Sequence, residues 1–183
     1  MTHDGERTSL RPYDGERDAV WAVHDRALRA SAVAFDPELD RYLRRPGRAF
    51  RAGECLVVVL DVSPPPDPAR RGPAGERVVA VGGYHPATAD AAAVGAESPV
   101  DPTPGTVEVR AVRVGPAFRR RGHGRRLVGA MEPRASEAGF ERTVLNTSVA
   151  LRAARGLYES LGDEAVGHES RGDAELVRYE RAP

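Results

Sequence analysis

The sequence predicts an α/β fold, in which one mixed, twisted sheet carries helices on both faces. Some segments have the pattern of strands, because apolar and polar residues alternate in them or because they are rich in Val. Along the chain, they alternate with segments of helical periodicity. Strand–helix–strand units in the second half favour parallel pairing, and short connections elsewhere favour antiparallel hairpins. The length of 183 residues predicts about one domain, which would span residues 1–183.

The first half of the chain supplies strands and two helices. A short strand is expected at Ser9–Tyr13, and apolar residues at helical spacing predict a helix over Asp14–Ala30. An Asp-Pro pair is typical of a helix start, so a second helix is expected at Asp36–Arg44. Two Val-rich strands follow, at Glu54–Val62 and Glu76–Tyr84.

Two long connections are expected to be flexible loops. The first, residues 63–75, holds five prolines, which cannot donate the hydrogen bonds of a sheet ladder. The second, residues 86–105, is rich in Ala, Pro and Asp. Loops of this length are functional or mobile, and their composition favours mobility.

The second half has a more regular pattern. An alternating strand at Thr106–Val114 leads into a Gly- and Arg-rich turn at Arg119–Gly124. The helix expected next, Arg125–Ala138, contains Pro133, which removes a backbone donor and predicts a kink or a break. The remaining predicted elements are a strand at Arg142–Thr147, a helix at Val149–Leu161 and two strands at Ala165–Glu169 and Glu175–Arg181.

The composition argues against several classes of protein. The longest apolar run, Cys55–Leu60, is far shorter than the ~20 residues that span a bilayer. The polar start lacks the hydrophobic region of a signal peptide. A single cysteine cannot form an internal disulfide, and the five histidines show no metal-ligand spacing. We therefore expect a cytoplasmic protein with no membrane partner and no metal site.

The formal net charge of zero hides a local asymmetry. All 27 basic residues are Arg, and seven of them lie between Glu108 and Glu132 without any acidic residue. This segment of +7 is set against a remainder of −7. Such a block fits a solvated charged face, an anion site or a nucleic-acid surface, and the neutral total argues against the last. Its members are Arg110, Arg113, Arg119, Arg120, Arg121, Arg125 and Arg126.

The turn before the predicted helix has the composition of a diphosphate-binding loop. Gly122 and Gly124 let a ligand approach the backbone, and the helix start directs free N–H groups at it. Arg120, Arg121 and Arg125 add charged donors. The dinucleotide fingerprint G-x-G-x-x-G is absent, and the chain has no Lys for a nucleoside-triphosphate loop.

Two motifs carry a resemblance to a known family. The turn R-R-R-G-H-G follows Val114-Gly115-Pro116, and L-Y-E-S-L-G stands at Leu157–Gly162. They resemble the acyl-CoA loop and the tyrosine motif of the GNAT superfamily of N-acetyltransferases, and the similarity covers about Thr106–Gly162. The resemblance implies the GNAT-like acyl-CoA N-acyltransferase fold, an acyl-CoA-binding core at about residues 106–162, and acetyl-CoA as cosubstrate without a metal. The residues that it implies for cofactor binding are Val112, Arg113, Val114, Arg119, Arg120, Arg121, Gly122, His123, Gly124 and Arg125.

The resemblance also implies direct transfer, in which a base takes a proton from the attacking amine and an acid protonates the leaving thiolate. Tyr158 matches the position of the family's acid. Glu108 matches a position where many members keep a base, often acting through water. The alternatives are a core aromatic for Tyr158 and an ordinary strand carboxylate for Glu108. His85 ends a predicted strand and could also face the acceptor.

Three positions depart from the family pattern. The family's Asn before the tyrosine is Leu151 here, and its Gly-Phe pair is Gly162-Asp163. Pro133 is unusual in the cofactor helix. Asn146 on the preceding strand is a candidate to replace the lost Asn contact with the cofactor.

These features predict an enzyme that moves an acetyl group from acetyl-CoA to a primary amine. A non-catalytic acyl-CoA-binding module and a nucleic-acid binder are the alternatives, and a homodimer is left open. The acceptor, a small molecule or a protein N-terminus, is expected against the first two helices and the long loops. The acidic remainder of the chain favours a cationic acceptor. The aromatic residues available there are Trp21, Phe35, Tyr42 and Phe50.

Overall fold

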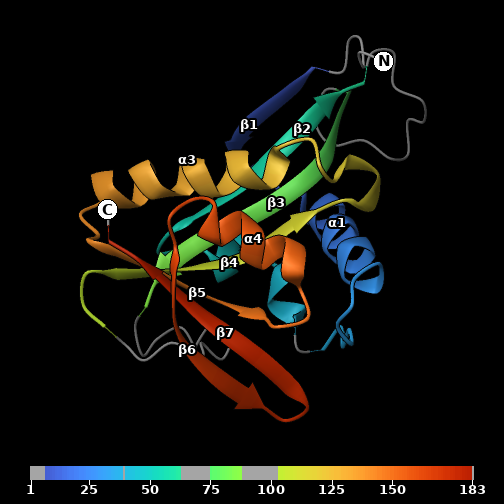
Figure 1. Cartoon of the computed structure of the whole chain (residues 1–183). Coiled ribbons are helices and arrows are strands. Elements are labelled where there is room, and N and C mark those ends of the chain that lie inside the picture. Colours follow the sequence, from blue (N-terminus) through green and yellow to red (C-terminus); the bar gives the residue numbers. More distant parts are fainter. Residues whose placement is uncertain (1–6, 39, 63–74, 88–102, 183) are drawn as a thin grey trace.

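One seven-stranded sheet organises the computed structural model, which describes residues 7–38, 40–62, 75–87 and 103–182. The strand order is β1-β2-β3-β4-β5-β7-β6, and every neighbouring pair is antiparallel except β4 and β5. Figure 1 shows the twist of this sheet, so the predicted mixed, twisted sheet is confirmed. The strands are β1 (Thr8–Pro12), β2 (Glu54–Asp61), β3 (Glu76–Pro86), β4 (Thr106–Val114), β5 (Arg142–Ser148), β6 (Glu164–Arg171) and β7 (Ala174–Arg181).

Helices cover both faces of the sheet, as predicted. Residues of β2 alternate between two cores, because successive side chains of a strand point to opposite faces. Leu56 and Val58 pack into the core under α3 (His123–Glu137) and α4 (Arg152–Glu159). Val57 and Val59 pack into the core under α1 (Arg17–Arg29), the 3-10 helix η1 (Arg41–Arg44) and α2 (Pro46–Ala49). A second 3-10 helix, η5 (Pro116–Phe118), follows β4.

The predicted helix at Asp36–Arg44 is wrong in extent. An Asx turn forms at its start, because the Glu38 N–H donates to Oδ1 of Asp36 at 2.9 Å. The regular structure that follows is divided into η1 and α2. The division falls at Arg45, whose backbone is not helical (φ −137°, ψ 66°), since a residue before proline avoids the helical region and Pro46 follows it.

Pro133 does not break its helix. The helix α3 runs without interruption over 15 residues and begins at His123, two residues before the predicted start. The side chain of Arg134 donates to the carbonyl oxygen of Ala130 at 2.8 Å in the turn that holds Pro133. The strand β3 continues through Pro86, so the second long connection starts later than predicted. The predicted loops at residues 63–75 and 86–105 otherwise lie mostly outside the described residues.

Gly53, just before β2, is required by close packing. A Cβ atom at this position would lie 2.0 Å from the carbonyl oxygen of Tyr84, a backbone atom that cannot rotate away. We expect Gly53→Ala to lower the free energy of unfolding by about 1–3 kcal/mol, the cost of overpacking a core. Gly156→Ala in α4 is the control: no heavy atom lies within 4 Å of its Cβ, and Ala favours a helix. Urea denaturation of both variants tests this, and equal stabilities would contradict it.

Candidate functional site

The site begins where the two parallel strands separate. β4 and β5 pair only at Thr106–Arg142, Val107–Thr143 and Glu108–Val144. Beyond Glu108, β4 continues to Val114 and β5 to Ser148 along diverging paths (Figure 1). Strand edges that diverge leave backbone N–H and C=O groups facing a wedge, where an extended ligand can take the place of a missing strand.

A β-bulge in β4 sets the direction of the side chains beside this wedge. Ala111 has a φ of +56°, and Ala111 and Val112 together lie opposite the single residue Gly82 of β3. A Cβ on Gly82 would lie 2.7 Å from Cε of Met131 and 3.2 Å from Cγ2 of Val112, so the glycine leaves room for these two side chains. The bulge puts Arg110 and Arg113, three positions apart, on the same face of the sheet as α1.

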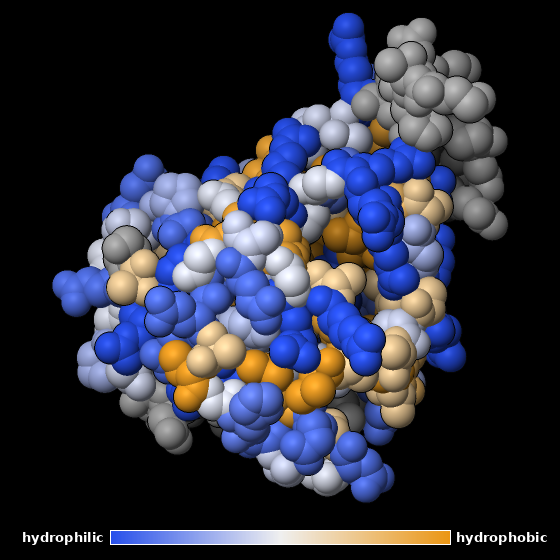
Figure 2. All heavy atoms as spheres, in the orientation of Figure 1, coloured by the Kyte–Doolittle hydropathy of each residue, from blue (hydrophilic) through white to orange (hydrophobic). Residues whose placement is uncertain are grey.

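The loop after β4 presents a helix start to the same region. Gly122 adopts the left-handed conformation (φ +81°) immediately before α3, with open space around it. The first intrahelical bond is donated by the Arg126 N–H to the Gly122 carbonyl at 2.9 Å, so the N–H groups of residues 123–125 point outward along the axis. Figure 2 shows strongly hydrophilic residues around an apolar recess beside this helix end and the end of β4. An anion is favoured at such a position.

The second glycine of the turn has a different role from the first. A Cβ on Gly124 would lie 3.0 Å from Cδ2 of Leu157, so this glycine lets α3 approach α4. The side chain of Arg125 donates to Oγ of Ser160 at 2.7 Å and joins the same two helices. The loop is thereby held against the helix that carries Tyr158.

The seven arginines of the basic block do not form one site. Arg119 donates to the carbonyl oxygens of Ala27 (2.8 Å) and Ala30 (3.0 Å), so its guanidinium caps the C-terminal end of α1. Arg126 donates to the Thr8 carbonyl at 3.1 Å and ties α3 to β1. These two side chains fasten the loop to the fold. Arg120 and Arg121 stay exposed beside the helix start, and Arg121 lies over the ring of Phe118.

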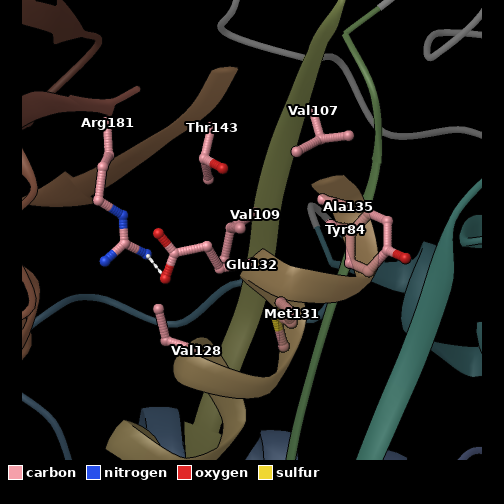
Figure 3. Close-up of a pocket in the computed structure, with 9 residues that line it drawn as sticks. All are labelled: Tyr84, Val107, Val109, Val128, Met131, Glu132, Ala135, Thr143 and Arg181. Carbon is pink, nitrogen blue, oxygen red and sulfur yellow. Dashed lines mark ion pairs between the residues drawn. The ribbon is translucent and has the colours of Figure 1, made fainter. Parts of the chain in front are cut away.

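An apolar hollow between α3 and the strands is not part of this site. Figure 3 shows Val128 and Met131 of α3 facing Val107 and Val109 of β4, with Glu132 and Arg181 ion-paired at 3.1 Å across one end. The hollow has no room for a water-sized molecule. It is therefore a seam of the core, which holds α3 on the sheet.

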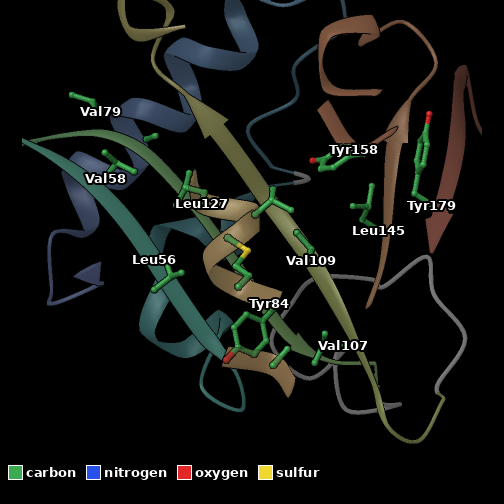
Figure 4. Close-up of a cluster of buried hydrophobic side chains, with 14 of the residues drawn as sticks. Leu56, Val58, Val79, Tyr84, Val107, Val109, Leu127, Leu145, Tyr158 and Tyr179 are labelled. Atoms are coloured by element: carbon green, nitrogen blue, oxygen red, sulfur yellow. The ribbon is translucent and has the colours of Figure 1, made fainter. Parts of the chain in front are cut away.

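Tyr158 lies on α4, on the face of the sheet opposite α1. Its ring is buried and packs 6.0 Å from the ring of Tyr179, measured between centroids. In Figure 4 its hydroxyl end is turned toward β4. Burial raises the pKa of Tyr158 to about 12, although the charge of Arg113 acts in the opposite sense. The phenol therefore keeps its proton at neutral pH and can act as a donor.

Glu108 and His85 are brought together as a cross-strand pair of β4 and β3. Both side chains are buried, and Nε2 of His85 lies 3.5 Å from Oε2 of Glu108. Nδ1 of His85 lies 2.9 Å from the Pro86 carbonyl oxygen, which can only accept, so Nδ1 carries the proton of the neutral ring. Burial lowers the pKa of His85, while the Pro86 carbonyl and the Glu108 carboxylate act against it. At neutral pH, Nε2 thus offers a lone pair beside the carboxylate.

Asn146 stands on β5 beyond the point of divergence. Its side-chain nitrogen and oxygen are both buried, and neither has a hydrogen-bond partner. Buried amide groups are almost always paired, so this one fits a ligand with an amide or carbonyl of its own. Leu151, which replaces the Asn of the family pattern, precedes α4 and contributes its carbonyl to the Arg155 N–H.

The residues present fit acetyl-CoA. The diverging strands offer backbone groups to the amides of the pantetheine arm, along Val112, Arg113 and Val114. The outward N–H groups at the start of α3 suit the diphosphate. Asn146 supplies a further unpaired amide. Of the predicted cofactor residues, Arg113, Arg119 and Arg125 each have a guanidinium that already donates a hydrogen bond within the protein.

A polar and aromatic cluster covers the α1 face of β4; it includes Trp21, Phe35 and Tyr42, which the sequence placed in the acceptor region, and adds Asp40, which the sequence did not single out. Nε2 of His24 lies 3.2 Å from Oδ2 of Asp40, and the His24 ring contacts Trp21 and Phe35. Burial alone would raise the pKa of Asp40, but its contact with His24 and the charges of Arg113 and Arg110 hold it below the usual value. The alternating pattern of β4 could have placed Arg110 in this cluster, since residues two apart on a strand share a face and Glu108 is two residues away.

Comparison with known families gives one clear match. The description "Acetyltransferase (GNAT) family" matches residues 69–163 of this chain. A search of curated proteins found no match.

Solved structures with the same fold come from several bacteria. A GNAT-family acetyltransferase from Staphylococcus aureus superposes with a TM-score of 0.71 at 10% identity, over 96% of this chain and 99% of that one. A putative acetyltransferase from Salmonella typhimurium, solved with its cofactor acetyl-CoA, gives 0.65 at 18% identity, over 96% and 93%. A ribosomal-protein-alanine N-acetyltransferase from Brucella melitensis gives 0.64 at 18% identity, over 96% and 99%.

Two further properties concern the part of the chain that the structure describes. None of its helices is long and apolar enough to cross a membrane. Nor does it contain a group of three or more His, Cys, Asp or Glu side chains placed to hold a metal ion.

Proposed function

This chain belongs to the GNAT acetyltransferase family, and we propose that it transfers the acetyl group of acetyl-CoA directly to a primary amine. The observation that carries the proposal is Tyr158, a buried phenol that keeps its proton and turns its hydroxyl toward β4. In the reaction, the amine nitrogen bonds to the acetyl carbon as the carbon–sulfur bond breaks. Tyr158 donates its proton to the departing thiolate.

The proton of the amine goes to the pair formed by His85 and Glu108. The amine can donate to both Nε2 of His85 and Oε2 of Glu108, because these acceptors are 3.5 Å apart. His85 takes the proton, and Glu108 stabilises the imidazolium that results. In this proposal Glu108 thus acts through His85, whereas the resemblance implied a base that often acts through water.

The cosubstrate is held by the loop and the wedge. In the proposal, the backbone of residues 119–125 binds the diphosphate, with Arg120 and Arg121 as charged donors. Val112, Arg113 and Val114 bind the pantetheine arm through their backbone, and Asn146 meets one of its amides. The proposal treats residues 1–183 as one cytoplasmic domain with an acyl-CoA-binding core at residues 106–162.

Two measurements test this function. Acetyl-CoA is expected to raise the midpoint of thermal unfolding, since a ligand of the native state stabilises it. A panel of primary amines is then mixed with acetyl-CoA and the free thiol of CoA is followed. Release that depends on the amine supports transfer. A thermal shift without release for any amine would leave only the alternative of an acyl-CoA-binding module, and no shift would refute both.

A further inference from the structure

We infer that the acceptor carries a compact anionic group, a carboxylate or a phosphate, close to its amine, and that Arg110 and Arg113 bind this group. The inference rests on the proposed function, because it names the class of amine that the acetyltransferase uses. It also replaces the cationic acceptor that the charge of the whole chain favours.

Arg110 is a largely buried cation with an unused donor group. Its side chain is 15% exposed and stacks over Tyr42, with 4.8 Å from the guanidinium carbon to the ring centroid. Its Nε lies 3.6 Å from Oε1 of Glu108, too far for a hydrogen bond, and its Nη1 is buried without a partner. The two N–H groups of Nη1 therefore remain available to a ligand.

Arg113 completes a second side of the same region. Its Nη1 donates to the Val112 carbonyl at 3.0 Å, while its Nε is buried without a partner. Within the described part of the chain, no carboxylate forms an ion pair with it. Arg113 lies opposite Val81 on the α1 face of the sheet, and its charge helps to lower the pKa of Asp40 on that side.

Arg113 differs in this respect from the other arginines with buried nitrogens. Arg110, Arg178 and Arg181 also have nitrogens without a hydrogen bond, yet each has a carboxylate within 4 Å: Glu108 at 3.6 Å, Glu180 at 3.4 Å and Glu132 at 3.1 Å. Glu108 balances the charge of Arg110 without a hydrogen bond to it, and Asp40 is near enough to both arginines for their charges to lower its pKa. They leave the N–H groups without acceptors, and an unmet buried donor is costly.

A carboxylate or a phosphate on the acceptor would meet these donors. Both groups match the planar fork of a guanidinium and accept two N–H bonds. Arg110 is the next residue after Glu108 on the α1 face of β4, and the amine binds beside Glu108. The anion that Arg110 binds therefore has to lie a few bonds from the amine. The two positive charges also disfavour the ammonium form, so they help keep the amine neutral for attack. A protein N-terminus has a peptide group in place of this anion and fits less well.

Matched pairs of amines test the inference on the wild-type enzyme. Glycine is compared with glycinamide, and phosphoethanolamine with ethanolamine, by the kcat/KM of CoA-thiol release. The anionic member of at least one pair is expected to react faster by about tenfold or more, the usual effect of a charged hydrogen bond. The pair with the larger ratio identifies carboxylate or phosphate. If amines react but the neutral members do equally well, the inference is overturned and the function stands.

Variants then assign the effect to the two arginines. Arg113→Gln and Arg110→Gln are each expected to lower the anionic-to-neutral ratio of kcat/KM by about tenfold, mainly through KM for the amine. Arg113→Lys keeps the charge and should retain part of the ratio. Arg142→Gln is the control, because this exposed strand arginine lies at the far end of β5, 3.9 Å from Glu180. An unchanged ratio in both Gln variants would assign the preference elsewhere.

Discussion

Replacing Tyr158 with Phe is expected to lower kcat by on the order of 100-fold, the usual contribution of a general acid. The variant keeps the ring in its buried place against Tyr179 and removes only the hydroxyl that protonates the thiolate. Its affinity for acetyl-CoA should stay within about twofold, because the loop and the wedge are untouched. Steady-state kinetics and a binding titration with acetyl-CoA measure the two quantities.

Tyr179→Phe is the matched control for this variant. Tyr179 belongs to the same core, but its hydroxyl donates to Oε1 of Glu159 at 2.7 Å and accepts from Nε of Arg155 at 3.3 Å. Its removal should cost about 1 kcal/mol of unfolding free energy and leave kcat unchanged. Equal kcat values for Tyr158→Phe and the wild type would exclude Tyr158 as the acid and make it an ordinary core aromatic.

The sheet and the loop motif were accessible from the sequence, because both depend on local patterns. Alternation predicted β4, and the glycines placed the turn before α3. The sequence did not show which arginines of the basic block are free to bind a ligand and which bind other parts of the protein. Whether an arginine binds a ligand or a distant carbonyl depends on contacts between elements far apart in sequence, such as Arg119 with Ala27. The seven charges look alike along the chain, although Arg119, Arg125 and Arg126 each join elements that are distant in sequence.

The shared face of Arg110 and Arg113 could not be predicted from the sequence for a related reason. Strict alternation along β4 would put Arg110 and Arg113 on opposite faces, since they are three residues apart. The bulge at Ala111 instead puts both arginines on the same face. An Ala side chain gives no indication that its residue adopts a positive φ. The pairing of His85 with Glu108 likewise follows from the register between β3 and β4, which only the assembled sheet determines.

Glu108→Gln is expected to lower kcat/KM by on the order of 100-fold and to change its pH dependence. Burial lowers the pKa of His85 below its usual value of 6.5, so the ring is neutral at pH 7 and activity falls only as the pH drops below about 6.5. The carboxylate of Glu108 raises that pKa, because it attracts the imidazolium. Its loss should therefore lower the pKa of His85 further and move the acid limb of the profile to lower pH. A purely structural role for Glu108 would reduce activity without moving the limb.

Glu137→Gln, an exposed change on α3, should alter neither quantity. If the acid limb of Glu108→Gln stays in place, Glu108 does not act on the proton that His85 takes up. A shift to lower pH shows that Glu108 on β4 stabilises the protonated form of His85 on β3.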